Sequence, residues 1–204
     1  MFKILLLTIV LLSLSACGPR YGDFYPCHDD GTVKPRIVLL PTKDCTGSNE
    51  RADYFFQNIR YKLMDCGDMY VFSEESVHHQ LDKMGNISFF NHDISFAKNF
   101  GGADFIVATE IAECSSDIYG EVEDKCMPPH LQRKNLLKVS LRVRVIDLRG
   151  DVPTIVLQEI TTRHLLVPCR SSIEQMDMSY FQRISDRLIE DFVTRLESVT
   201  WSYR

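Results

Sequence analysis

The segment 136–148 alternates apolar and polar residues more regularly than any other part of this 204-residue chain. In an extended strand, every second side chain points to the same face. One face carries Val139, Leu141, Val143 and Val145, and the other carries Lys138, Ser140, Arg142 and Arg144. The pattern predicts a strand with one apolar face and one polar, mainly basic face.

Further strand and helix patterns flank this segment on both sides. Strands are predicted at residues 36–41, 69–72, 104–111 and 154–167, and helices at residues 49–66, 73–84, 92–100 and 179–199. Ser73 is the expected N-cap of the second helix, with Glu74 and Glu75 in its first turn. Residues 42–48 are expected to form a loop, and residues 112–135 a long polar insertion.

The order of these elements, β-α-β-α-α-β-β-β-α, limits the fold class. The early strands are joined by helical crossovers, which suit parallel pairing, and the late strands follow one another as antiparallel neighbours. We therefore expect an α/β (α+β) fold with a single mixed sheet of about five strands and helices packed on the sheet.

The first residues of the chain have the features of an export signal. Lys3 precedes an apolar run at residues 4–12, and residues 13–16 are small and nearly neutral. The run is too short to span a bilayer, which needs ~20 apolar residues. Ordinary cleavage after Ala16 would place the bulky Leu14 at position −3, where a small residue is preferred.

The segment Leu14-Ser15-Ala16-Cys17 resembles the lipobox of bacterial lipoproteins. In that family the cysteine thiol takes a diacylglycerol, and the cysteine becomes the first residue of the mature protein. The resemblance implies that Cys17 anchors the protein through lipid, and two or three acyl chains would hold it stably. Gly18 follows where an aspartate would mark inner-membrane retention in enterobacterial lipoproteins. We expect the outer membrane, with the protein facing the periplasm.

The chain is therefore expected to have three parts. Residues 1–16 form the signal peptide, residues 17–33 the lipidated cysteine and a turn-rich tether, and residues 34–204 a globular α/β domain. The formal net charge of the chain is −5. A mildly acidic protein is a poor candidate for binding nucleic acid or an anionic membrane surface. The lipid, not a basic patch, is expected to hold it at the membrane.

Six cysteines remain besides the anchor: Cys27, Cys45, Cys66, Cys114, Cys126 and Cys169. In an exported protein an even number suggests disulfides, and six cysteines allow 15 pairings. Cys114 and Cys126 are the favoured pair, because both fall in the expected insertion at residues 112–135. Free buried thiols are the alternative. The spacings do not match those of a structural metal site, so we expect no metal.

Residues 97–107 read Ala-Lys-Asn-Phe-Gly-Gly-Ala-Asp-Phe-Ile-Val. This helix end, Gly-Ala-Asp turn and aromatic-aliphatic strand resemble a group of envelope proteins, as do the strand at residues 138–147 and the closing helix. The group includes the curli secretion-channel lipoprotein, the lipoprotein activators of penicillin-binding proteins, and the amino-terminal domain of the Tol-system propeller protein. The six cysteines resemble envelope lipoproteins of chlamydia-type bacteria more closely.

This resemblance implies a non-enzymatic periplasmic domain that binds protein partners or builds an oligomeric pore. The pore-forming relatives use two amphipathic hairpins, whereas the only comparable insertion here, at residues 112–135, is polar. The group has no short active-site motif, so no catalytic residue is carried over. The resemblance implies no cofactor.

Three sets of polar residues are candidates for function. Lys138, Arg142 and Arg144 could be a docking face for an acidic partner or glycan, or could pair with cross-strand acids such as Glu159. The adjacent histidines at residues 78–79 point ~100° apart on a helix, which favours solvated or half-buried side chains over a metal site. The Cys-His-Asp-Asp run at residues 27–30 is expected to form a turn.

Three functions follow from these patterns. The first is a lipid-anchored periplasmic protein-binding or assembly factor without chemistry of its own, whose partner is an unidentified envelope protein. The second is an oligomeric outer-membrane secretion-channel subunit, which would make the protein a homo-oligomer. The third is an anchored hydrolase, although no Gly-x-Ser-x-Gly turn is present to expose a nucleophile.

Overall fold

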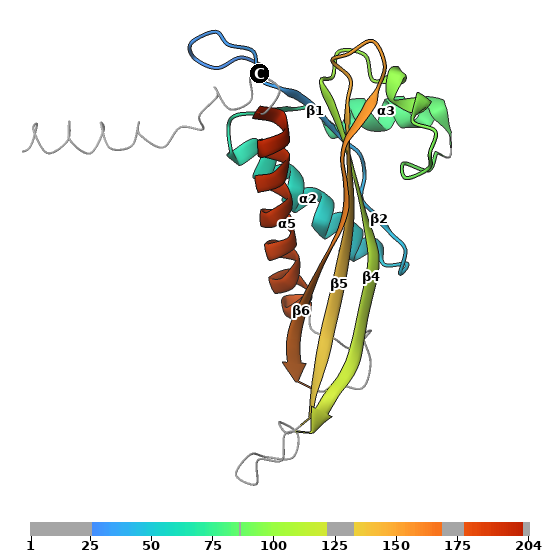
Figure 1. The fold of residues 1–204 in the computed structure, drawn as a ribbon, viewed down its shortest axis with the longest axis vertical. Coiled ribbons are helices and arrows are strands. Elements are labelled where there is room, and N and C mark those ends of the chain that lie inside the picture. Colours follow the sequence, from blue (N-terminus) through green and yellow to red (C-terminus); the bar gives the residue numbers. More distant parts are fainter. Residues whose placement is uncertain (1–25, 86, 122–132, 169–177, 202–204) are drawn as a thin grey trace, which may run out of the picture.

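A computed structural model describes residues 26–85, 87–121, 133–168 and 178–201. Within these ranges the fold is a mixed six-stranded sheet with helices packed against it, as predicted (Figure 1). Five strands follow the order β3-β1-β4-β5-β6, and the sixth, β2, pairs with β4. The strands are β1 (Arg36–Leu39), β2 (Lys43–Asp44), β3 (Tyr70–Val71), β4 (Phe105–Glu121), β5 (Arg133–Asp147) and β6 (Thr154–Pro168). The helices are α2 (Asn49–Asp65), α3 (Glu74–Met84), the 3-10 helix η3 (Ser95–Asn99) and α5 (Met178–Trp201).

The pairing of the strands agrees with the expected division of the sheet. The early strands are parallel, since β1 pairs with both β3 and β4, and β2 also runs parallel to β4. The late strands β4, β5 and β6 form an antiparallel meander. Helical crossovers separate the parallel strands in sequence, which is the connection that parallel pairing requires.

The hairpin of β4 and β5 is longer than predicted, and the expected polar insertion at 112–135 is partly wrong. The two strands stay paired to the Glu121–Arg133 register, so both ends of that segment belong to the sheet. Residues 112–121 lack apolar alternation, which is why the sequence indicated a loop. Backbone hydrogen bonds to the neighbouring strand form without an apolar face.

Two other local predictions differ from the structure. The expected loop at residues 42–48 contains β2, whose two residues carry no periodic signal. The expected helix at residues 92–100 is the five-residue 3-10 helix η3. In contrast, the Ser73 cap is confirmed, because its hydroxyl accepts a hydrogen bond from the Ser76 backbone N–H. Such a cap satisfies one of the free amide groups at a helix N-terminus.

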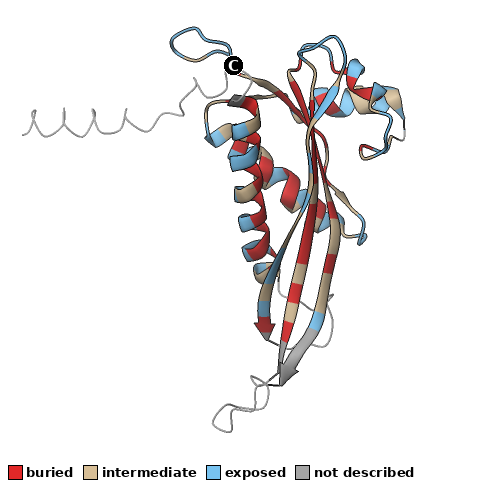
Figure 2. Cartoon of the chain, viewed as in Figure 1, coloured by how far each residue is buried: buried red, intermediate tan, exposed pale blue. Residues whose placement is uncertain are grey.

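The two faces of the sheet are covered unequally (Figure 2). Helices α2 and α5 pack on one face over the apolar row of β5, and the largest buried side chains there include Phe55, Phe105 and Phe181. The other face is covered by α3, η3 and the segment between them, around Phe96 and Phe100. This second cover lies at the β1 end of the sheet. The far halves of β4, β5 and β6 have no described helix over this face (Figure 1).

Candidate functional site

The part of the sheet that α3 and η3 leave uncovered is the first candidate site. We call it the open face and define it by the strand positions that point away from α5. They are Glu110, Glu113, Ser115 and Asp117 of β4, Lys138, Ser140 and Arg142 of β5, and Ile160, Thr162, His164 and Leu166 of β6. Alternation along antiparallel strands brings these side chains into one surface.

Two of the three predicted docking cations form ion pairs on the open face. The Lys138 Nζ lies 2.7 Å from a Glu113 carboxylate oxygen, and the Arg142 Nη1 lies 2.9 Å from a Glu110 oxygen. The hydrogen bond from Lys138 holds the pKa of the Glu113 carboxyl below its usual value. Both acids belong to the neighbouring strand β4, so the expected cross-strand pairing occurs.

The acid named for that pairing, Glu159, is the wrong one. Glu159 lies opposite Val143 in the β5–β6 register, so its side chain points to the face covered by α5. There its carboxylate accepts a hydrogen bond from Arg195 of α5. The sequence could not show this, because the register between two strands is set by the whole hairpin.

Arg144, the third predicted cation, is buried rather than exposed. Only 4% of its surface is accessible. Its guanidinium donates hydrogen bonds to the backbone oxygens of Phe89, Phe90 and Asn91 at 2.7–3.0 Å, and to the amide oxygen of Gln158 at 2.8 Å. Burial, with the nearby Arg142 as a smaller cause, lowers its pKa. Arg144 therefore fastens the segment after α3 to the sheet and leaves little of its charge for a partner.

A hollow of about 610 Å³ lies where the open face meets the segment that contains Phe90. Its walls include Phe90, Arg142, Arg144 and Ile160. The guanidinium carbons of both arginines lie 5.4–5.5 Å from the centre of the Phe90 ring, within the range of a cation–π contact. None of the described side chains forms an ion pair with Arg144. The hollow thus combines an apolar wall with two arginines whose guanidinium groups already have partners in the chain, and Glu159 also lines it.

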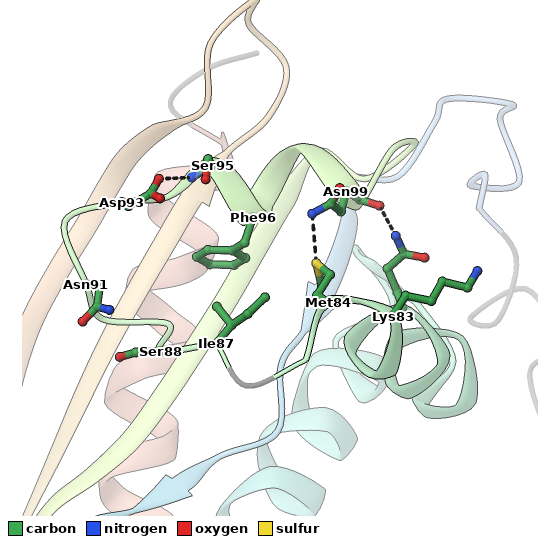
Figure 3. Close-up of a pocket in the computed structure, with 10 residues that line it drawn as sticks. Lys83, Met84, Ile87, Ser88, Asn91, Asp93, Ser95, Phe96 and Asn99 are labelled. Carbon is green, nitrogen blue, oxygen red and sulfur yellow. Dashed lines mark hydrogen bonds between the residues drawn. The ribbon is translucent and has the colours of Figure 1, made fainter.

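A second hollow of about 720 Å³ lies between α3 and η3 (Figure 3). Its wall is mostly polar and includes Lys83, Asn91 and Asp93 around Phe96. The Asn99 side chain donates to the Met84 sulfur at 3.0 Å. Sequence reasoning missed this hollow, and the only signal for it is the density of polar residues at 86–95.

The histidines behave as the sequence predicted. His78 lies 3.6 Å from the Glu74 carboxylate one helical turn earlier, and about half of its side-chain surface is exposed. Among the residues that the structure describes, no three histidine, cysteine, aspartate or glutamate side chains lie close enough together to hold a metal ion. The run at residues 27–30 forms a turn, as expected, closed by a bridge from Cys27 to Val33.

The structure records four free thiols, and Cys126 and Cys169 lie outside the described residues. Cys27, Cys45 and Cys66 are exposed, and Cys114 is buried. Cys114 lies in β4 within the core under α2 and α5, not in a loop, so the reason given for pairing it with Cys126 was wrong. The pairing itself stays a prediction.

The expected export signal and the anchor Cys17 also lie outside the described residues and stay predictions. In the part of the chain that is described, no helix has the length and apolar character needed to cross a membrane.

The fold resembles that of several solved bacterial proteins. The hypothetical protein CT253 from Chlamydia trachomatis has a TM-score of 0.52 at 19% identity, over 82% of this chain and 98% of that one. Lipoprotein GNA1162 from Neisseria meningitidis has a TM-score of 0.47 at 13% identity, over 80% of this chain and 98% of that one. The PelC dodecamer from Paraburkholderia phytofirmans has a TM-score of 0.39 at 10% identity, over 76% and 84%. At these identities the likeness concerns the fold alone.

Sequence comparison gives the family and not the activity. No curated protein matches the chain significantly. The profile of one family matches residues 23–200, which include all of the described sheet and nearly all of α5. The chain therefore belongs to DUF7499, a family of unknown function.

Proposed function

We propose that this protein is a lipid-anchored envelope protein that faces the periplasm and binds a protein partner through the open face, without catalysing a reaction. Cys17 would carry the lipid, and the domain would present the open face to the partner. The lipobox-like segment at residues 14–17 supports the anchor.

The observation that carries the proposal is the composition of the open face. Ile160 is 56% exposed and Leu166 is 47% exposed, beside the ion pairs of Lys138 and Arg142. Protein interfaces combine an apolar centre with a polar rim, and exposed apolar groups beside organised polar groups mark such surfaces. The charges here are already paired, so a partner would meet them without leaving an unpaired buried charge.

Part of the expected tether belongs to the described domain. Residues 26–34 form a small closed turn, in which the Lys34 N–H donates to the Pro26 oxygen at 2.8 Å. The rest of the expected tether, residues 17–25, lies outside the described residues.

Photocrosslinking in intact cells tests the proposal. A crosslinking amino acid at Asp117 or at Lys138 of the open face should capture one envelope protein, identified by mass spectrometry. The matched control is Tyr61, which is 66% exposed on α2 across the sheet. Capture at Tyr61 equal to that at Lys138, or no protein captured at either open-face position, would contradict the proposal.

The anchor needs its own experiment. Cys17→Ser should abolish lipid attachment and release the protein from the membrane fraction, whereas Cys27→Ser should not. Metabolic labelling with a fatty acid and fractionation of the envelope measure both effects. Normal labelling of the Cys17→Ser variant would refute the anchor and leave the open-face proposal to stand or fall on the crosslinks.

A second function, the oligomeric channel subunit, has one observation in its favour. The β4–β5 hairpin stays paired to the Glu121–Arg133 register and extends past the start of α5 (Figure 1). A projecting hairpin is the element that could contribute strands to a shared barrel. The mass of the complex extracted in detergent tests it, because a channel requires a ring of many copies.

A further inference from the structure

The sheet ends in two edges of very different length. One edge is β3, which has two residues, and the other is β6, which has fifteen. Among the described strands none pairs with the outer side of β6. A long free edge exposes backbone donors and acceptors, and proteins usually protect it with proline, lysine or a covering element. Within β6 the only proline is its last residue, Pro168, and the strand contains no glycine or lysine.

The same strand holds much of the exposed apolar surface. The large exposed apolar residues of the described chain are Val33, Tyr61, Val152, Ile155, Ile160 and Leu166. Three of these six lie on β6, and Val152 lies in the turn that precedes it. An edge strand with unpaired backbone and exposed apolar side chains is the kind of edge that accepts another strand.

The sequence of β6 is complementary to itself when it is reversed about Thr161. In an antiparallel pair centred on this residue, Thr161 faces its own copy and Ile160 faces Thr162. The remaining opposed pairs are Gln158 with His164, Glu159 with Arg163, and Leu157 with Leu165. Glu159 and Arg163 thus oppose each other with opposite charge and Leu157 meets Leu165, whereas Ile160 meets the hydroxyl-bearing Thr162. Shifting the centre to residue 160 or 162 removes the opposition of Glu159 and Arg163.

The structure sets where this complementary segment begins. The register of β5 and β6 shifts at Val156, because Val145 faces Leu157 while Ile146 faces Ile155. Such a bulge bends a strand and interrupts regular pairing. The regular part of the edge therefore starts at Leu157, which is also the first residue of the self-complementary segment.

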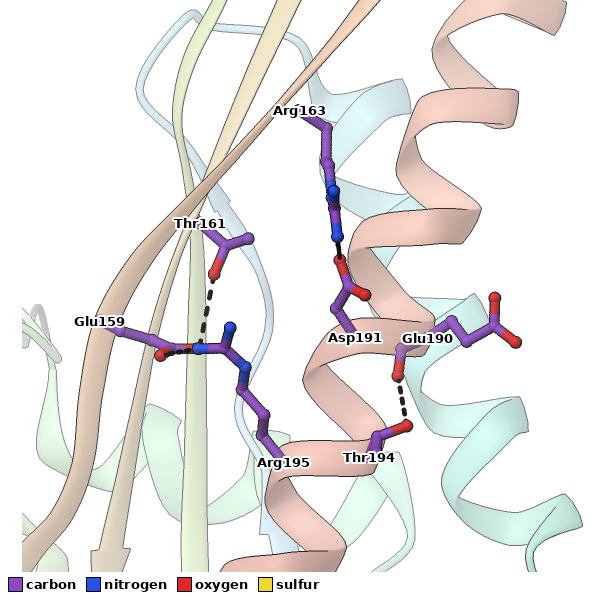
Figure 4. Close-up of polar contacts among 7 residues, drawn as sticks. All are labelled: Glu159, Thr161, Arg163, Glu190, Asp191, Thr194 and Arg195. Carbon is purple, nitrogen blue, oxygen red and sulfur yellow. Dashed lines mark hydrogen bonds and ion pairs between the residues drawn. The ribbon is translucent and has the colours of Figure 1, made fainter.

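Figure 4 shows how the two charged residues of this segment are held. Glu159, Thr161 and Arg163 all point to the α5 side. Arg195 donates to Glu159, and Arg163 donates to Asp191. The Arg163 and Arg195 side chains are still 49% and 50% exposed, so each pair can accept a further partner. In the proposed pairing, Glu159 of one copy would face Arg163 of the other. Each half of the interface would then hold a row of four alternating charges: Arg195 and Glu159 of one copy, followed by Arg163 and Asp191 of the other.

We propose that β6 pairs with β6 of a second copy in antiparallel register centred on Thr161. The dimer has two-fold symmetry, and its interface is isologous, as in most homodimers. The two sheets join into one, with the α5 helices on the same side. Pairing with a strand of an unrelated protein would not require β6 to be complementary to its own reversed sequence. The complementarity about Thr161 therefore favours a second copy of this chain as the partner.

Charge reversal tests the register. Glu159→Arg places arginine opposite arginine, and Arg163→Glu places glutamate opposite glutamate, so each single variant should weaken dimerisation at least tenfold. The double variant restores opposite charges across the interface and should recover most of the loss. Within one chain, however, the double variant breaks both contacts with α5. A purely intrachain role would therefore make it worse than either single variant. Sedimentation of the full chain in detergent measures the dimer, and circular dichroism checks the fold.

Cysteine crosslinking gives an independent measurement that does not depend on those charges. Only residue 161 faces itself, and opposed Cβ atoms in antiparallel strands lie ~4.5–5.5 Å apart. Thr161→Cys should give a disulfide-linked dimer on mild oxidation. The control Gln158→Cys lies about 20 Å from its copy in this register, from ~3.4 Å per residue, and should not link beyond the background of the native cysteines. Equal linking at both positions, a monomer at all concentrations, or a dimer indifferent to charge reversal would each overturn the proposal.

Discussion

Asp104 joins the start of β4 to the start of β1 through Arg36. Its carboxylate accepts hydrogen bonds from the Arg36 backbone N–H at 2.8 Å and from the guanidinium at 3.1 and 3.2 Å. The Asp104 N–H in turn donates to the Arg36 oxygen at 2.8 Å. This network gives a physical role to the aspartate of the Gly-Ala-Asp turn. It fixes the alignment of two parallel strands that are 68 residues apart in the sequence.

Replacing Asp104 should therefore destabilise the fold. Asp104→Ala removes three hydrogen bonds and leaves the Arg36 N–H without its acceptor, so we expect the free energy of unfolding to fall by about 1–3 kcal/mol. The control is Asp93→Ala, because the hydrogen bonds of Asp93 are local ones with Ser95, two residues further along the chain, on the surface. Urea denaturation of both variants measures the difference. Equal losses would contradict the alignment role of Asp104.

Arg144 should contribute more to stability than the neighbouring Arg142. Arg144→Met leaves three backbone oxygens without their donor. A buried group left without a hydrogen bond lowers the free energy of unfolding by about 1–3 kcal/mol. Arg142→Met removes one ion pair of an arginine side chain that is 39% exposed, which contributes about 1 kcal/mol. Arg144→Lys should also lose stability, although it keeps the charge, because a lysine ammonium lacks the planar set of donors of a guanidinium. Limited proteolysis near residues 89–91, combined with urea denaturation, provides the readout.

Cys66 should react slowly with alkylating reagents even though the residue is exposed. Burial of its sulfur, followed by a hydrogen bond with Glu197, raises the pKa of the Cys66 thiol from 9.0 to about 11. A pKa that is higher by two units reduces the thiolate fraction about 100-fold. A more basic thiolate is also a stronger nucleophile, and this raises the alkylation rate again by about 6–10-fold. We expect iodoacetamide at pH 8 to modify Cys66 roughly tenfold more slowly in the folded than in the unfolded chain. A Glu197→Gln variant should narrow this difference, and equal rates would contradict the pKa shift.

Acid should weaken the turn between β5 and β6 through Asp147. Hydrogen bonds from the Arg149 side chain lower the pKa of the Asp147 carboxyl below its usual value. A lowered folded-state pKa gives stability that is fully present above the unfolded pKa of ~3.9 and is lost as the pH falls through the folded value. Asp147→Asn should therefore be less stable than the parent at pH 6, and the gap should close toward pH 2. Asp151→Asn, an exposed change in the same turn, should follow the parent curve at every pH.

The candidate site was only partly predictable. The sequence placed Lys138, Arg142 and Arg144 on one strand face, and the structure confirms the shared face. It could not distinguish their environments, because the segment at residues 89–91 covers Arg144 and leaves the Lys138 side chain 35% exposed. Contacts between residues more than 50 positions apart carry no local periodic signal.

The sequence by itself determined the alternating strand of Val139 to Val145, the stripes of α2 and α5, and hence the mixed sheet with helices on it. These follow from side-chain spacing within a single element. Only the tertiary structure decided the length of the β4–β5 hairpin, the burial of Arg144 and the position of β6 as the last strand of the described sheet. Each of these depends on which distant backbone supplies the hydrogen-bonding partner, and backbone groups are the same in every residue except proline.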